Sequence, residues 1–319
     1  MYRQLKKLLL SVCFSSAPLF AFSAHADTLT LVVGASPGGT TDLIARGLSK
    51  DLADLLDQTV IVENKPGAGG NIAANFVARS KKDGNTLLVS FTSFSVNASL
   101  YKSLPFDPLK DFTPISLLAE VPSVLIAHES FPADTVQGVI DILEENPGKY
   151  SFGIGGIGSS LHMATANFMM QADIDELMVP YKGTAPAIQD LLAGELDLMF
   201  ASTENVTGLL DSDRVKVIGL TGEVGTPQFE GFPQISDTLS EFSSKAWFGI
   251  FAPAGIPQER LVELTNAVHT AAESPDYTKL FKDNGGIVVT LEPEEFEQYI
   301  IKDIDAYAEL VEFTGVQLD

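Results

Sequence analysis

The sequence is poor in the side chains that form disulfides and bind metals. Its 319 residues include one cysteine, Cys13, and four scattered histidines. A single cysteine cannot form a disulfide within the chain, and neither an HExxH nor a CxxC pattern occurs. We therefore expect no structural disulfide, no metal site and no cofactor.

Basic residues are also scarce. The chain has 20 lysines and arginines against 42 aspartates and glutamates, a formal net charge of −22. This acidic balance argues against binding to nucleic acid or to anionic membrane surfaces, because both carry negative charge. It suits a soluble globular protein whose partner is neither of these.

Long apolar runs are absent except near the N-terminus. Residues 8–22 are mostly apolar and follow three basic residues, and Ala24-His25-Ala26 has the small-x-small pattern of a signal-peptide cleavage site. We predict that residues 1–26 are a signal peptide, that the mature chain begins at Asp27, and that the protein is exported to the periplasm. Loss of the three basic residues would bring the net charge to −25.

Two other interpretations of the N-terminal segment fit less well. A membrane anchor would need about 20 apolar residues to span a bilayer, and this apolar run is shorter. Lipid attachment at Cys13 would need a small residue before it, whereas Val12 stands there and apolar sequence continues beyond Cys13. Secretion without an anchor is therefore the prediction.

Short β-rich runs alternate with helical patterns along most of the chain. Residues 29–33, 59–63 and 86–90 are such runs, and a second block with the same alternation extends over 136–220. Alternation of this kind is typical of an α/β fold with mainly parallel sheets flanked by helices. The Gly-, Pro- and Ser-rich segment 221–244 is predicted to be a long surface connection.

Two further apolar segments, 121–127 and 247–252, have the composition of strands that cross between the two blocks. Helical patterns follow the second crossing and continue to the end of the chain. We therefore predict a hinged, two-lobed clamshell. Lobe one would consist of 27–122 plus 248–319, and lobe two of 123–247.

The first glycine-rich loop, Gly34 to Asp42, follows the first strand and opens a helix. It resembles a phosphate-binding P-loop, but Thr40 stands where that motif has its lysine, so a nucleoside triphosphate site is not expected. Two interpretations stay open: a cradle of backbone N–H groups that holds an anion at the helix N-terminus, or a plain strand–helix turn. Asp42 is interpreted as a first-turn partner of Arg46 and not as a catalytic acid.

The second loop, 153–158, has three glycines in the spacing of a dinucleotide-binding motif. No acidic residue ends the next strand to hold a ribose, so this match is weak. The hydroxyls of Ser159 and Ser160, together with the loop N–H groups, favour an anion cradle instead. His162 is interpreted as a packing or hydrogen-bonding residue, since no G-x-S-x-G elbow accompanies it.

A third loop, 181–186, offers further hydrogen-bond donors before a helix, at Gly183 and Thr184. Donor-rich turns at 92–97 and 202–205 are lesser candidates. Backbone N–H groups at helix N-termini are suited to anions because the helix dipole favours negative charge there. The loops of both blocks therefore predict a site for a small anion.

The loops lie within longer segments that resemble one family. The chain resembles the substrate-binding components of tripartite tricarboxylate transporters, the Bug or TctC family, and the resemblance covers nearly the whole mature chain. The resemblance implies a type II periplasmic-binding-protein fold and a carboxylate ligand held largely by backbone amides and bridging waters, with no dedicated arginine. The matching segments are SPGGTTDLIAR (36–46), VIVENKPGAGGNIAANFVAR (60–79), DGNTLLV (83–89), LPFDPLKDFTPI (104–115), GSSLHMA (158–164), VPYKGTAPAIQDLLAGELDLMF (179–200) and WFGIFAPAGIP (247–257).

The chain departs from the family pattern at two positions that bear on the ligand. The family usually has an aromatic residue at the place of Ala35 and often an Asp at the place of Ala201. We therefore expect a di- or tricarboxylate, or an aromatic carboxylate, to bind better than an amino acid. The ligand-binding residues expected by motif position or loop chemistry are Ala35, Ser36, Gly38, Gly39, Thr40, Ser93, Gly158, Ser159, His162, Gly183, Thr184, Ala185 and Ala201.

The resemblance implies a monomeric binding protein that captures a small carboxylate and delivers it to the membrane subunits of a transporter. A binding protein that instead feeds a membrane signalling kinase stays open, because the sequence does not separate transport from sensing. An enzyme is not expected, since no nucleophile, base and orienting acid fall into place.

Overall fold

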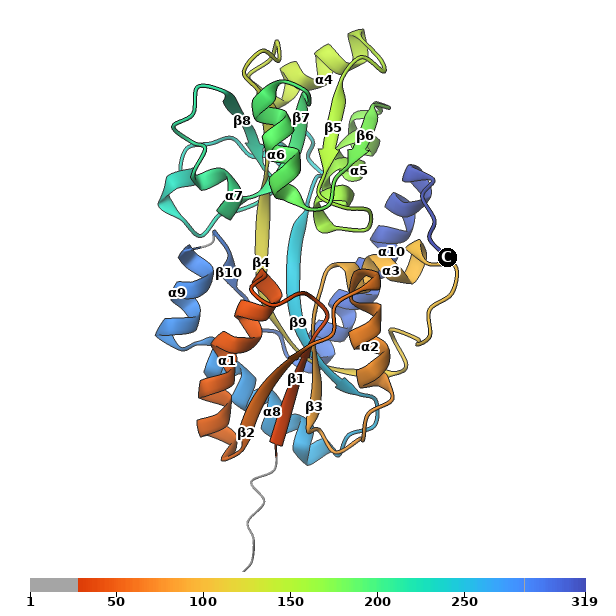
Figure 1. The fold of residues 1–319 in the computed structure, drawn as a ribbon, viewed down its shortest axis with the longest axis vertical. Helices are drawn as coiled ribbons and strands as arrows, with labels where there is room; N and C mark the ends of the chain where they lie inside the picture. Colours follow the sequence, from red (N-terminus) through yellow and green to blue (C-terminus); the bar gives the residue numbers. More distant parts are fainter. Residues whose placement is uncertain (1–27, 284) are drawn as a thin grey trace, which may run out of the picture.

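The structure is a computed structural model that describes residues 28–283 and 285–319 (Figure 1). The predicted signal peptide, its cleavage before Asp27 and the alternative lipid site at Cys13 lie outside these residues. Within them, no helix is long and apolar enough to cross a membrane.

Lobe one, the lower part of Figure 1, is built on three parallel strands, β1 (Thr28–Val33), β2 (Thr59–Asn64) and β3 (Thr86–Phe91), with β9 (Lys245–Pro253) antiparallel to β3. Successive side chains of β1 point to opposite faces. Leu31 and Val33 pack with α1 (Thr40–Leu56) and α8 (Gln258–Ala272), and Val32 packs with α2 (Asn71–Ala78) and α10 (Pro293–Thr314). β1 and β3 are apolar on both faces because helices cover both, whereas the edge strand β2 has an exposed face with Thr59, Ile61 and Glu63.

Lobe two has the same kind of core. Its strands are β5 (Ser151–Ile154), β6 (Leu177–Pro180), β7 (Leu198–Ser202) and β8 (Val215–Leu220), and β5 is parallel to both β6 and β7. The helices of lobe two are α4 (Val136–Glu145), α5 (Ser160–Ala172), α6 (Thr184–Ala193) and the short α7 (Thr203–Thr207).

The long strand β4 (Phe112–His128) belongs to both lobes. It pairs antiparallel with β9 from Phe112 to Pro122 and then with β7 and β8 from Ser123 onwards, so its partner strand changes between Pro122 and Ser123. The resulting strand order is β2-β1-β3-β9-β4-β7-β5-β6, with β8 and β10 (Ile287–Val288) also paired to β4. Figure 1 shows β4 and β9 passing together between the lobes.

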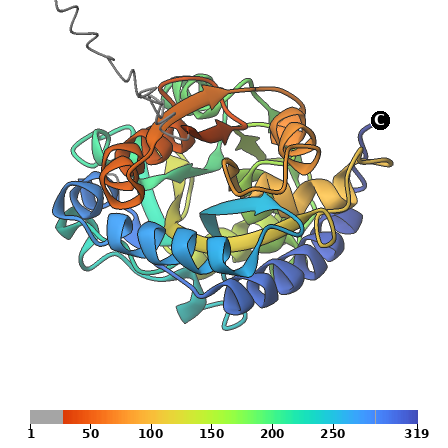
Figure 2. The same ribbon diagram turned by 90° about the horizontal axis from the view of Figure 1, so that it is seen from below.

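The C-terminal helices return to lobe one and also touch lobe two. Figure 2 shows them in blue along the left and lower sides of the view. Helix α9 (Pro275–Asp283) packs on α1, while α10 contacts both α3 (Ser93–Leu100) of lobe one and α5 of lobe two. Val96, Met163 and Leu310 belong to the apolar cluster where these three helices meet. The lobes are therefore in contact away from the crossing strands as well.

The predicted two-lobed α/β architecture is confirmed, with three corrections to its elements. The first crossing strand begins at Phe112, well before the apolar run that predicted it. The donor-rich turns at 92–97 and 202–205 lie at the starts of helices α3 and α7. The segment 221–244 is more than a surface connection, because it buries Phe229, Ile235 and Phe242 in the cores of lobe two. The residue boundaries predicted for the two lobes stay predictions.

Candidate functional site

A cavity of about 170 Å³ lies between the lobes, next to the crossing strands. Lobe one contributes the start of α1 and parts of β4 and β9, and lobe two contributes the starts of α5 and α7. We call it the cleft cavity. Its lining residues are Thr40, Val121, Pro122, Ser123, Ser160, Leu161, Ser202, Glu204, Ser244, Ala246 and Phe248.

Two helices begin at this cavity, one from each lobe. Thr40 is the first residue of α1, and Ser160 and Leu161 are the first two of α5. The first N–H groups of a helix have no partner within it, and the helix dipole is positive at this end. The two N-termini, with the hydroxyl of Ser160, therefore suit a small anion held between the lobes.

The remaining wall combines an apolar side with further hydroxyls. Phe248 on β9 is 7% exposed and provides an aromatic surface beside Val121 and Leu161. Ser123, Ser202 and Ser244 add hydroxyl groups to the lining. Such a wall can pack against a short carbon chain while leaving polar contacts at its ends.

Glu204 on α7 brings a carboxyl group to the same cavity. The hydroxyls of Thr40, across the cleft, and of Ser202 face this carboxyl group and act to lower its pKa. Burial of the carboxyl raises the pKa of Glu204, and the two hydroxyls only partly offset this effect, although the residue as a whole is exposed. Among the described lining residues, Glu204 is the one that titrates.

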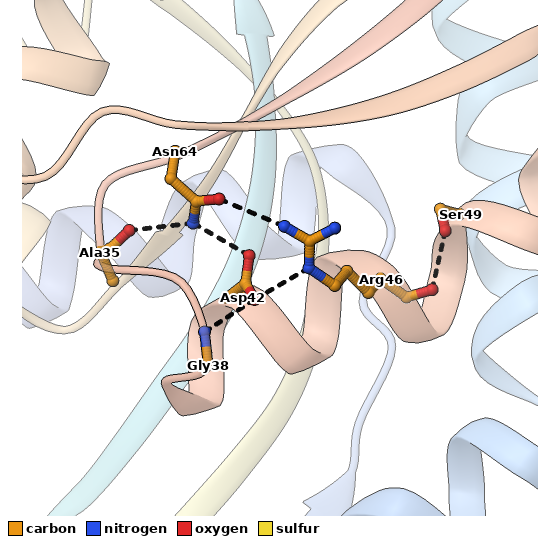
Figure 3. A network of polar contacts seen from close by, with 6 residues as sticks. All are labelled: Ala35, Gly38, Asp42, Arg46, Ser49 and Asn64. Carbon is orange, nitrogen blue, oxygen red and sulfur yellow. Dashed lines mark hydrogen bonds and ion pairs between the residues drawn. The ribbon is translucent and has the colours of Figure 1, made fainter.

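The loop before α1 is held in place by Asp42 (Figure 3). Its carboxylate accepts hydrogen bonds from the Gly38 N–H and the Arg46 Nε, both at 2.9 Å, and from the Asn64 side chain. Asn64 also donates to the Ala35 carbonyl at 3.0 Å. The hydrogen bond from Arg46 is the main reason that the pKa of Asp42 falls to about 2. Asp42 is thus an ionised anchor for the loop, as its spacing from Arg46 predicts.

The corresponding loop of lobe two is held by the start of α5. Ser159 caps the helix, because its hydroxyl accepts from the His162 N–H at 3.1 Å and donates to the Gly156 carbonyl at 2.8 Å. His162 is 1% exposed, and its Nδ1 accepts from the Gly158 N–H. Burial lowers the pKa of His162 to about 4, so the ring is neutral at neutral pH.

One hydrogen bond ties the two lobes on the α3 side of the cleft. The Ser93 hydroxyl donates to the Gly158 carbonyl at 2.9 Å, and both residues are buried. Together with the contact between Thr40 and Glu204, it shows that the cleft is closed down onto the cavity.

Comparison with known protein families identifies the family of this chain. The model of the tripartite tricarboxylate transporter family receptor, TctC, matches residues 44–316. The chain belongs to this family. BugT of Bordetella pertussis is 31% identical over 309 residues, which are 95% of this chain and 94% of BugT.

Solved structures of similar proteins agree with the family and the fold. The periplasmic binding protein BugD is 32% identical with a TM-score of 0.74, covering 91% of this chain and 98% of BugD. A Rhodopseudomonas palustris protein with adipate is 27% identical with a TM-score of 0.77, covering 91% of this chain and 98% of that protein. MatC of the same organism, with bound malate, is 30% identical with a TM-score of 0.73, covering 89% of this chain and 98% of MatC. The TctC family and these neighbours consist of binding proteins, so the expectation of a binding protein and not an enzyme is confirmed.

In this TctC receptor, the expected ligand-binding residues of lobe one do not all reach the cavity. Thr40 lines it. Ser36, Gly38 and Gly39 lie in the exposed loop just before Thr40, where the Gly38 N–H is already bonded to Asp42. Ala35 is half-buried against the core of lobe one. Their contact with ligand stays a prediction.

The expected residues of lobe two fall into two groups. One group already has hydrogen-bond partners within the protein: Gly158, Ser159 and His162, together with Ser93 of lobe one. Gly183, Thr184 and Ala185 begin α6 and do not line the cleft cavity, although a Cβ at Gly155 would lie 3.1 Å from the Thr184 hydroxyl, so the two loops touch.

Ala201 requires a correction. It is fully buried in the core of lobe two, among residues such as Val124 and Leu191, so its side chain is not part of the cavity wall. The argument that Ala201 leaves the cavity without a carboxylate therefore fails, because Glu204 supplies one a few residues later. The sequence signal was the donor-rich turn 202–205, but only the packing of α7 shows that its acid faces the cleft.

Proposed function

We propose that this protein is an extracytoplasmic solute-binding protein that captures a small carboxylate in the cleft cavity and delivers it to the membrane subunits of a tripartite tricarboxylate transporter. The observation that carries the proposal is the meeting of two helix N-termini, those of α1 and α5, from opposite lobes at one closed cavity. The ligand would be a di- or tricarboxylate or an aromatic carboxylate. We further propose a periplasmic location and a monomer.

The similar proteins support this ligand class, because their solved structures contain adipate and malate. The size of the cavity refines it. At about 170 Å³ it is smaller than the roughly 300–1,000 Å³ of sites for drug-sized ligands. In this closed form the protein therefore favours short dicarboxylates over the bulkier members of the class.

Contact donors are sufficient for useful affinity despite the acidic chain. Salt screens the net charge beyond about 8 Å, so the repulsion acts weakly at the distances over which a ligand approaches. Hydrogen bonds to a charged group contribute about 1.5–3 kcal/mol each. Several of them at the N-termini of α1 and α5 reach the roughly −8 kcal/mol of micromolar binding.

A thermal-shift screen of purified mature protein against mono-, di- and tricarboxylates, aromatic carboxylates, aspartate and glutamate tests the proposal. A ligand at 100 times its dissociation constant adds about 2.7 kcal/mol of stability. Ser160→Asp, which places negative charge at the α5 N-terminus, should abolish the shift. Ser240→Asp, at an exposed position of lobe two, is the matched control and should respond as the wild type does. A screen in which no carboxylate shifts the wild type would contradict the proposal.

A further inference from the structure

The position of Glu204 constrains what a carboxylate ligand can carry besides its first carboxylate group. The cavity joins the anion-favouring N-termini of α1 and α5 to a carboxyl group of the protein. The hydroxyls of Thr40 and Ser202 face this carboxyl group, and a carboxylate has acceptor positions for several hydrogen bonds. A ligand group that reaches Glu204 therefore meets an acceptor.

An ionised second carboxylate does not fit beside an ionised Glu204. Two ionised carboxylates that share a site repel each other, which raises the pKa of one of them until it takes up a proton. The lining residues offer no cation to compensate, since the others described are hydroxyl, apolar or aromatic. A small adjoining hollow on the α9 side of Glu204 is likewise lined by Thr40, Leu43, Ile44, Val121, Leu280 and Phe281.

We propose that Glu204 is a specificity-determining residue, which requires the second polar group of the ligand to bring a proton to the cavity. This rests on the proposed capture of a carboxylate at the same site. A hydroxyl or ammonium group meets the requirement directly. A dicarboxylate meets it by binding together with one proton from solvent, which is shared between the second carboxylate of the ligand and Glu204.

The surroundings of Glu204 leave it as the group that takes up this proton. Burial and the two hydroxyls account for its pKa, and among the described residues no charged neighbour contributes. Helix α7 and strand β7 contain no other titratable residue. Among the titratable residues on neighbouring elements are Asp42 and Arg46 on α1, which pair with each other; Glu120 on β4 and Lys245 on β9, which also pair; buried His162 on α5; and Lys279 and Lys282 on α9.

The direction of the pH effect follows from the raised pKa of Glu204. A bound anion raises the pKa of Glu204 further, so the complex holds a proton that the free protein releases at higher pH. Dicarboxylate affinity should therefore increase as pH falls from 8 to 5, by up to about tenfold per pH unit for one proton taken up, and level off below the pKa of the free protein.

Isothermal titration calorimetry tests the proposal with succinate and adipate, and with their analogues in which one carboxylate is replaced by a hydroxymethyl or an aminomethyl group. In buffers of different ionisation enthalpy, wild-type protein should take up close to one proton with a dicarboxylate and much less with the two analogues. Glu204→Gln should bind the dicarboxylate at pH 8 at least about tenfold more tightly than wild type, without the pH slope. It should also lose affinity for the aminomethyl analogue.

Glu230→Gln, at an exposed glutamate elsewhere on lobe two, is the control and should keep the wild-type pH slope. If wild type binds dicarboxylates without proton uptake, or if Glu204→Gln keeps the slope, the role of Glu204 is wrong while carboxylate capture stands. If no carboxylate or analogue binds at any pH, the proposed function itself is wrong. The proton count on wild type decides the question even if Glu204→Gln does not fold.

Discussion

Two adjacent serines at the start of α5 illustrate how single residues divide the work of this site. The Ser159 hydroxyl is occupied on both sides, by the His162 N–H and the Gly156 carbonyl. Ser160 lines the cleft cavity instead. Helix caps stabilise the protein, whereas donors at a cavity stabilise the bound ligand, so the two positions separate stability from affinity.

Ser160→Ala should weaken carboxylate binding by roughly ten- to hundredfold, the value of one hydrogen bond to a charged group of about 1.5–3 kcal/mol, with an unchanged melting temperature. Ser159→Ala should instead lower the free energy of unfolding by about 1 kcal/mol, because it removes a helix cap. Calorimetric titration and urea unfolding of both variants measure the two effects. Equal losses of affinity, with no loss of stability at position 159, would show that Ser159 also contacts the ligand.

At the scale of elements, the loop before α1 is held by a carboxylate that belongs to the helix itself. Asp42 joins the loop, through Gly38, to its own helix and to Asn64 at the end of β2. Its side chain is 3% exposed, but that of its partner Arg46 is 51% exposed. Solvent screening at Arg46 reduces the strength of this pair, so the contribution of Asp42 to stability rests mainly on the hydrogen bonds from Gly38 and Asn64.

Asp42→Ala should lower the free energy of unfolding by about 1–2 kcal/mol at pH 7, because the Gly38 and Asn64 donors lose their acceptor. The pKa of Asp42 is lowered to about 2 in the folded protein. Its contribution is therefore complete above about pH 4, the unfolded value, and is lost as pH falls towards 2. Urea unfolding measured from pH 7 to 2 should show that the free energy of unfolding falls less with decreasing pH in the variant than in the wild type. Asp54→Ala, on the exposed face of the same helix, should behave as wild type.

At the scale of the whole molecule, the lobes meet through a close backbone approach as well as through the ligand site. The Gly158 carbonyl accepts from Ser93, and a Cβ at Gly158 would lie 2.5 Å from the end of the Leu100 side chain on α3. Closure thus brings the second glycine-rich loop against lobe one. A ligand that contacts both lobes supplies the differential affinity that closure requires.

Small-angle scattering should show a smaller radius of gyration when a carboxylate binds the wild type. Gly158→Ala should reduce both this compaction and the affinity, because the added methyl group meets Leu100. Gly148→Ala is the matched control: it also has a positive φ, 71° against 77°, but nothing lies within 4 Å of its Cβ. If the two variants compact alike, the approach at Gly158 does not limit closure.

Local pattern predicted the elements of this fold well. The runs 29–33 and 86–90 are strands whose apolar side chains serve two covered faces, and 59–63 is an edge strand whose residues alternate between exposed and half-buried. Both patterns are visible as composition and spacing. Thr40 and Ser160 could be predicted as site residues for a similar reason, since a glycine-rich loop that opens a helix indicates where hydrogen-bond donors are exposed. The two α/β blocks and the apolar crossing segments predicted the two-lobed arrangement, which the family resemblance also implies.

The sequence by itself determined the two α/β blocks, the helix N-termini and the acidic, cysteine-poor character of the protein, because these depend on neighbours along the chain. Only the tertiary structure decided which side chains share the cavity. Ala201 is turned into the core of lobe two, whereas Glu204 meets Thr40 of the other lobe. That contact depends on how β4 changes partners and how the lobes close, and residues so far apart in sequence leave no local pattern that records it.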